Sequence, residues 1–137
     1  MTTSPLQSLM ADVDREIRAL EQAPSRDACD LQPLVEHALL LANRLMLAFA
    51  GVMDHPLDGL GVDADPLEVF RVFVKGEPSL NAIRDNVREL VYYRNCLAAG
   101  RADALPARPA AMAVRTVRHI YLYLRTRAIK EHGLEGA

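Results

Sequence analysis

The segment 30–54 constrains the fold more than any other part of the chain, because apolar residues cover nearly all of its helical surface. A helix that is apolar almost all round belongs in the centre of a bundle. Its most apolar stretch, residues 38–53, carries Asn43 and Arg44 in its middle and is shorter than the roughly 20 residues of a membrane span, which hold few or no charges. We therefore predict a core helix, most buried over residues 31–53 and not a membrane helix. The polar residues within it share one narrow stripe: Glu36, His37, Asn43 and Arg44.

Prolines and glycines divide the rest of the chain into further segments with apolar residues at three- and four-residue spacing. No segment alternates apolar and polar residues as a strand does. The expected N-caps are Ser4, Asp30 and Ser79, and the expected C-terminal stops are Gly100 and Gly133. We predict helices over residues 5–22, 30–54, 66–75, 79–99 and 108–132.

The length of 137 residues is that of one domain, here residues 1–137. The predicted fold class is all-α, with four long helices and one short helix in an antiparallel up-and-down bundle. Cys29 and Cys96 are too far apart in sequence for a zinc motif or a disulfide framework, so we expect free thiols and a cytoplasmic location. The acidic loop 54–66 lacks the spacing of a calcium loop. We therefore expect a solvated loop, and neither a metal nor another cofactor.

The net charge of −2 argues against nucleic-acid binding driven by the overall charge of the chain. The charge is nevertheless uneven, because residues 105–137 hold six Lys and Arg against two Asp and Glu. In the last helix, Arg118 and Arg125 share a face and His119 lies beside it. That face either binds RNA phosphates or an acidic partner, or it is solvated or neutralised by the acidic first part of the same chain. The negative total charge favours the second interpretation.

One position conflicts with the pattern around it. The expected apolar seam of helix 79–99 has Leu, Ile or Val at five positions and Arg94 at the sixth. A charge buried alone costs several kcal/mol or more, so Arg94 needs a carboxylate, an interface or a ligand. A structural ion pair with Glu36 is one solution, and a side chain that reaches solvent from near the helix end is another.

The residues after Arg94 carry a resemblance to a known family. Arg94-Asn95, three further residues, Ala99 and Gly100 resemble the signature of the HEPN superfamily of small helical bundles, which reads Arg-Asn, three variable residues, His, Gly. The resemblance places this motif near the end of the penultimate long helix, and it implies paired copies whose motifs face each other. Members with the full motif include metal-independent ribonucleases, in which Arg and His act at the scissile phosphate and the ribose hydroxyl. Ala99 stands where that His would be, so the resemblance implies loss of catalysis.

Three functional hypotheses follow. The first is a non-catalytic HEPN-like homodimer, with no catalytic residues, that binds RNA, a nucleotide or a partner protein through Arg94 and Asn95. The second is a helical adaptor in which Arg94 forms a structural ion pair. The third is a metal-independent ribonuclease that uses a histidine from elsewhere in the fold, His119 first. His37 and His132 are expected to be structural, His37 in a hydrogen bond and His132 at a helix C-terminus.

Overall fold

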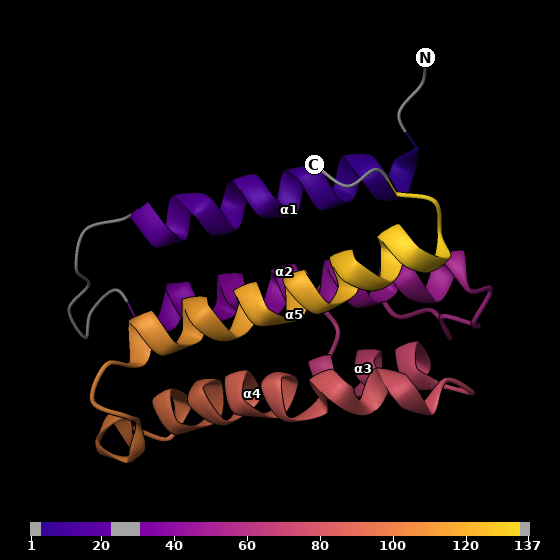
Figure 1. The fold of residues 1–137 in the computed structure, drawn as a ribbon. Helices are drawn as coiled ribbons and strands as arrows, with labels where there is room; N and C mark the ends of the chain where they lie inside the picture. The colour runs from indigo at the N-terminus through magenta and orange to yellow at the C-terminus, as the bar shows by residue number, and fades with distance from the viewer. Residues whose placement is uncertain (1–3, 23–30, 135–137) are drawn as a thin grey trace.

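The computed structural model describes residues 4–22 and 31–134. Within these two ranges the chain is helical and contains no strand, so the prediction of an all-α fold is confirmed. Successive long helices run in opposite directions, as an up-and-down bundle requires (Figure 1). The α-helices of these ranges are α1 (Pro5–Gln22), α2 (Leu31–Val52), α3 (Pro66–Val74), α4 (Arg84–Ala98) and α5 (Pro109–Glu131), and the 3₁₀ helices are η2 (Pro78–Ile83) and η3 (Ala102–Ala104).

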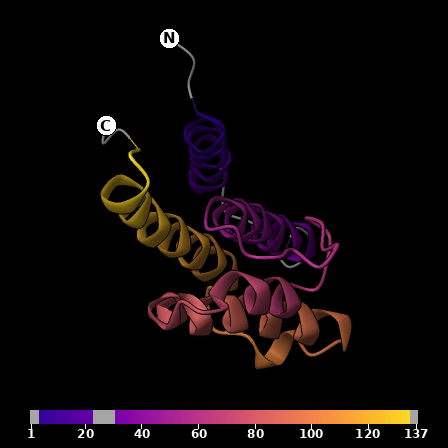
Figure 2. The same cartoon turned by 90° about the vertical axis from the view of Figure 1, so that its right-hand side faces the viewer.

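Helix α2 lies at the centre of the bundle. Figure 2 shows α1 on one side of the pair formed by α2 and α5, and α3 and α4 on the other side. Helix α2 contacts all four other α-helices and has more buried residues than any of them in the described ranges, as predicted. It is also the one helix of these ranges whose length and hydropathy would suit a membrane span, but more than half of its apolar stretch is buried inside the fold.

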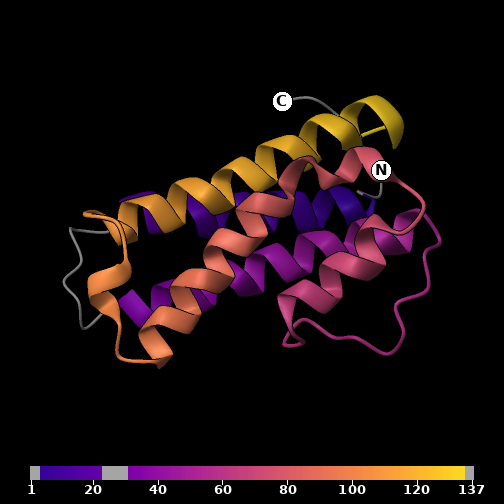
Figure 3. The ribbon, with the colours of Figure 1, turned by 90° about the horizontal axis from the view of Figure 1, so that it is seen from below.

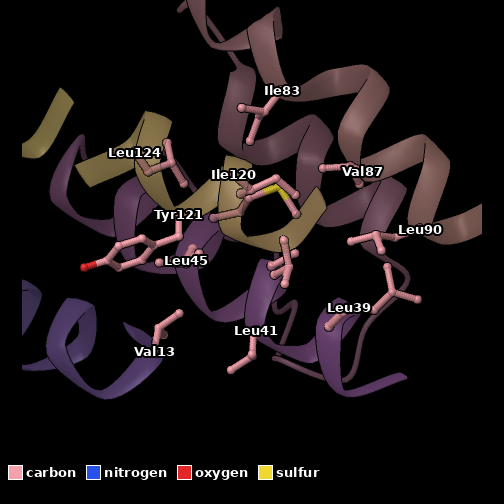
Figure 4. Close-up of a cluster of buried hydrophobic side chains, with 14 of the residues drawn as sticks. Val13, Leu39, Leu41, Leu45, Ile83, Val87, Leu90, Ile120, Tyr121 and Leu124 are labelled. Atoms are coloured by element: carbon pink, nitrogen blue, oxygen red, sulfur yellow. The ribbon is translucent and has the colours of Figure 1, made fainter. Parts of the chain in front are cut away.

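The core between α2, α4 and α5 is aliphatic. Figure 4 shows Val87 and Leu90 of α4, Ile120 of α5, and Leu39 and Leu45 of α2 in one cluster of buried side chains. Each of these side chains is at most 4% exposed. Burying one aliphatic side chain of this size contributes roughly 1.5–3 kcal/mol, so the cluster fixes how the three helices pack.

The N-terminal ends of the helices show which predicted caps form. Ser4 accepts a hydrogen bond from the backbone N–H of Gln7 at 3.1 Å, and Pro5 opens α1 as expected. Asp30, the expected cap of α2, lies outside the described residues, as does Cys29. At α3, Asp65 is the N-cap and accepts from the N–H of Leu67 at 3.1 Å.

The prediction of a single helix over residues 79–99 with Ser79 as its cap is wrong. The segment starts as η2 at Pro78, and α4 begins only at Arg84. Ser79 is drawn into contacts with α5 instead: its Oγ accepts from Arg127 at 3.0 Å, and its carbonyl accepts from the Tyr123 hydroxyl at 3.0 Å. This tertiary bonding replaces the local cap.

Candidate functional site

Arg94 lies in the last turns of α4 and is partly buried. Its Nε and Nη2 atoms lie 3.4 and 3.3 Å from the Oδ1 atom of Asn95, which makes two long hydrogen bonds between sequence neighbours. The expected ion pair with Glu36 does not form, and Glu36 is exposed on α2. Within the described ranges Arg94 has no carboxylate partner. Its guanidinium is therefore a cation that the described part of the chain does not neutralise.

Contrary to the prediction, position 94 is not part of the buried seam of α4. Its buried face continues from Leu90 to Tyr93, which is 3% exposed. The Tyr93 hydroxyl donates to Glu89 at 2.8 Å, and Thr116 of α5 donates to the same carboxylate oxygen at 3.0 Å. Burial and the neighbouring Glu89 raise the pKa of Tyr93 well above its usual value, so Tyr93 remains a donor. Arg94 therefore lies at the edge of the contact between α4 and α5.

The direction of α4 explains why Arg94 reaches solvent. Figure 3 shows α4 crossing beneath α2 and diverging from α5 toward its C-terminal end. Arg94 lies in this diverging part, where α5 covers less of the helix. Of the predicted solutions for Arg94, a side chain that reaches solvent near the helix end fits this arrangement best.

The outer face of α4 carries further polar and aromatic residues next to Arg94. Arg88, Tyr92 and Asn95 follow one another at spacings of four and three residues, so they share one side of the helix, and all three are exposed. The Tyr92 side chain is 50% exposed, which is unusual for so large an aromatic residue. Arg88 has no carboxylate partner within the described ranges. Arg94 projects from a different side of the helix and joins this group through its hydrogen bonds to Asn95. We call Arg88, Tyr92, Arg94 and Asn95 the α4 face.

Only part of the α4 face was predicted from the sequence. Arg94 and Asn95 stand out through the HEPN-like motif, whereas Arg88 and Tyr92 were not predicted. Their signal was present in the sequence, because a cation, an aromatic residue and an amide at positions i, i+4 and i+7 lie on one side of a helix. It became distinct only once the structure showed that this side faces solvent.

Ala99 and Gly100 end α4 beside this face. Gly100 has a φ of 70°, a left-handed conformation that glycine adopts most readily. The N–H of Arg101 bonds to the Cys96 carbonyl at 2.7 Å, and the N–H of Gly100 bonds to the Leu97 carbonyl at 3.2 Å. These two bonds form a complete Schellman motif, which confirms Gly100 as the stop of the helix. Ala99, the C-cap residue, is exposed.

The predicted site residue Arg118 is neutralised by α1. Its Nη1 donates to Asp14 at 2.6 Å, and its Nε and Nη2 donate to Glu21 at 3.0 and 2.8 Å. The guanidinium also lies over the Tyr121 ring, 5.3 Å from the centroid. The hydrogen bonds to Glu21 and Asp14 raise the pKa of Arg118 above its usual value. For Arg118, the interpretation as a cation neutralised by the acidic first part of the chain is the correct one.

His119 and Arg125 do not join Arg94. His119 is exposed on α5. The hydrogen bond between Thr116 and Glu89 marks the point along the two helix axes where α5 lies beside α4. Because the two helices run in opposite directions, His119 and Arg94 lie on opposite sides of that contact, about 12 Å apart along the axes. Arg125 is partly exposed in a groove between α5 and α1, which Arg118 also lines.

The other histidines have partners of their own. The Nε2 atom of His37 lies 2.9 Å from Glu16 of α1, which also accepts a hydrogen bond from Arg44. His132 is the C-cap residue of α5 and packs edge-on against Phe49, with ring centroids 5.7 Å apart. Both were predicted to be structural. The Nδ1 atom of His55 lies 3.2 Å from two carbonyls at the end of α3.

The acidic loop is held by a residue that the sequence analysis did not single out for this role. Asn43 of α2 is 2% exposed and donates to the carbonyls of Val62 and Ala64 at 2.8 and 2.9 Å. The loop aspartates are exposed. In the described ranges, no three side chains of metal-binding type converge on one point.

Comparisons of the chain with protein-family models, with curated proteins and with solved structures found no match. The HEPN resemblance therefore stands on the residues of the motif alone. The described fold puts that motif at the end of α4, with α5 as the long helix that follows.

Proposed function

We propose that this chain is a non-catalytic, HEPN-like helical domain that binds single-stranded RNA through the α4 face. The observation that supports the proposal is a pair of arginines that have no carboxylate partner in the described ranges and lie near the exposed Tyr92. Arg88 lies one turn before Tyr92 on the same side of α4, and Arg94 bonds to Asn95, which is also on that side. Cations next to an exposed aromatic residue are a typical combination for single-stranded RNA.

Each residue of the α4 face has a distinct part in this proposal. Arg88 and Arg94 contact phosphates, which supply most of the affinity and make it depend on salt. The Tyr92 ring stacks on an unpaired base, and the Asn95 amide bonds to a base edge or to a ribose hydroxyl. Arg118 and Arg127 are less suited to this role, because each already bonds to a carboxylate of the same chain.

The proposed domain binds RNA without cleaving it. Ala99 supplies no imidazole at the position that the resemblance assigns to catalysis, and His119 lies about 12 Å from Arg94 along the helix axes. A general acid or base contributes roughly 10²–10⁴-fold to such a reaction, so its loss leaves a binding surface.

We further propose a cytoplasmic homodimer in which two α4 faces lie next to each other, as the resemblance implies. Two linked sites on one strand raise the overall affinity, since the second contact becomes intramolecular. Light scattering of the purified chain tests this state directly, and a monomer at every accessible concentration would argue against it.

The binding proposal is tested by fluorescence anisotropy with a labelled single-stranded RNA of about 12 nucleotides. We expect Arg94→Gln and Arg88→Gln each to weaken binding about three- to tenfold at low salt and to reduce the salt dependence. The matched control is Arg71→Gln, because Arg71 is likewise an exposed arginine but lies on α3 rather than on α4. Equal effects of all three substitutions, or no binding by the wild type, would reject the proposal. A dimer that binds no RNA would favour the adaptor hypothesis.

A further inference from the structure

A groove of about 460 Å³ runs between α1 and α5. Ligand pockets for small molecules have volumes of roughly 300–1,000 Å³, so the groove is large enough for one. It lies on the side of α5 that faces α1, whereas α4 packs on the opposite side of the bundle (Figure 2). Its lining residues are Gln7, Met10, Ala11, Asp14, Arg18, Glu21, Arg118, Tyr121, Leu122, Arg125 and Leu134.

The groove has one more cation than it has carboxylates. Its two carboxylates, Asp14 and Glu21, face three arginines. Asp14 accepts from Arg118 at 2.6 Å and pairs with Arg18 at 3.1 Å, and Glu21 accepts twice from Arg118. Both carboxylates are therefore already engaged. Arg125 is left without a carboxylate partner within the described ranges, although it is partly buried.

A second unpartnered donor lies one helical turn from Arg125. Tyr121 is only 6% exposed, and its hydroxyl forms no hydrogen bond within the described ranges. Figure 4 shows this hydroxyl oxygen pointing away from the aliphatic side chains of the core. Tyr121 and Arg125 are four residues apart on α5, so both lie on the side that lines the groove. Burial raises the pKa of Tyr121, so the hydroxyl keeps its proton and can donate.

The groove also has an apolar part. Met10 and Ala11 of α1 lie on one side, and Leu122 of α5 and Leu134 lie on the other. Leu122 is 49% exposed, whereas most leucines of the chain are buried or half-buried. Met10 and Leu134 are already buried, so the exposed part of this surface belongs to Ala11 and Leu122. Covering it with an apolar ligand removes it from water and contributes to binding.

We propose that the groove is a binding site for a small organic anion with an apolar body, such as a medium-chain carboxylate. The anionic head accepts hydrogen bonds from the Arg125 guanidinium and the Tyr121 hydroxyl. The apolar body lies against Ala11 and Leu122. This site is separate from the α4 face and does not depend on RNA binding.

The test uses octanoate and 1-octanol, which share a chain length and differ in charge. Each is titrated into ¹⁵N-labelled wild type up to about 10 mM and followed by amide chemical shifts, a range that covers dissociation constants near 1 mM. We expect octanoate to shift amides of α1 and α5 that line the groove, and 1-octanol to bind about tenfold more weakly, because it lacks the charge-assisted hydrogen bonds.

Variants separate the two donors. Arg125→Gln should weaken octanoate about tenfold and leave 1-octanol unchanged, and Tyr121→Phe should weaken octanoate about two- to fivefold. The matched control is Arg115→Gln, an exposed arginine of α5 outside the groove, which should bind octanoate as the wild type does. The proposal is overturned by shifts that map elsewhere, by equal binding of the two compounds, by an Arg125→Gln variant that keeps full affinity, or by no octanoate binding over this range. None of these outcomes bears on RNA binding by the α4 face.

Discussion

Arg118 donates two hydrogen bonds, of 3.0 and 2.8 Å, to the carboxylate of Glu21, a residue 97 positions earlier in the chain. This ion pair joins the last helix to the end of the first. On the opposite side of α1, Glu16 bonds to His37 and Arg44 of α2. Helix α1 is thus held on α2 and α5 by its buried apolar residues and by an ion pair on each side of them (Figure 2).

Removing the Arg118 cation should loosen α1. We expect Arg118→Gln to lower the free energy of unfolding by about 1–2 kcal/mol, because its charged hydrogen bonds are partly buried while Glu21 remains partly exposed. Arg15→Gln is the matched control, since Arg15 is exposed and pairs only within α1, and it should change stability by less than about 0.5 kcal/mol. Urea unfolding followed by circular dichroism measures both, and equal stability of the two variants would contradict the assigned role.

The same ion pairs predict a loss of stability in acid. The pKa of Glu21 is lowered from 4.5, chiefly by the hydrogen bonds from Arg118, and the pKa of Glu16 is lowered from 4.5, chiefly by the hydrogen bond with His37. A lowered pKa in the folded state means that the stabilisation is complete above the unfolded value and is lost as the pH falls through the folded value. The free energy of unfolding should therefore decrease as the pH falls below about 4.5.

The carboxylates responsible can be identified by substitution. The double variant Glu16→Gln, Glu21→Gln should show a smaller loss of stability over this acid range than the wild type, because neither side chain then takes up a proton. The control Glu36→Gln removes an exposed carboxylate of α2 and should follow the wild-type profile. Parallel profiles for the wild type and the double variant would show that other groups govern the acid response.

The helix positions were predictable because they depend on local patterns. Apolar spacing and prolines place α1 over residues 5–22 and α3 within 66–75, each within one residue of the observed ends. The partners of Arg118 were not predictable, since they lie 97 and 104 residues away and depend on how α1 packs. For the same reason, the hydrogen bonds from Asn43 to carbonyls of the acidic loop were not predictable.

The error at Arg94 has a specific geometrical cause. The predicted seam assumed one continuous α-helix from Ser79, with about 3.6 residues per turn. The seam was predicted correctly as far as Leu90, because Leu80, Ile83, Val87 and Leu90 are all buried. Toward its C-terminal end, however, α4 diverges from α5 (Figure 3), so Arg94 is only partly buried and reaches solvent.

Two glycines offer a matched test of backbone conformation. Gly100 has a φ of 70°, and a Cβ atom added there would meet nothing within 4 Å, so the cost of Gly100→Ala comes from the backbone alone. We expect it to lower the free energy of unfolding by about 1 kcal/mol. Gly51 lies inside α2 and also has open space around a Cβ, so Gly51→Ala should raise stability by roughly 0.5–1 kcal/mol. Changes of the same sign in both variants would refute this assignment.

The last prediction concerns the position that separates this chain from the full HEPN motif. Ala99→His should restore the sequence Arg-Asn, three residues, His, Gly. Because Ala99 is exposed at the C-cap of α4, the substitution should change stability by no more than roughly 1 kcal/mol. On the proposed function, the wild type should not cleave single-stranded RNA without metal, whereas Ala99→His should cleave it. Cleavage should disappear again in the double variant Ala99→His, Arg94→Ala. Gel analysis of a labelled RNA incubated in EDTA compares all three proteins. Metal-independent cleavage by the wild type that is lost in Arg94→Ala would contradict the non-catalytic assignment and direct attention to His119, the exposed histidine of α5.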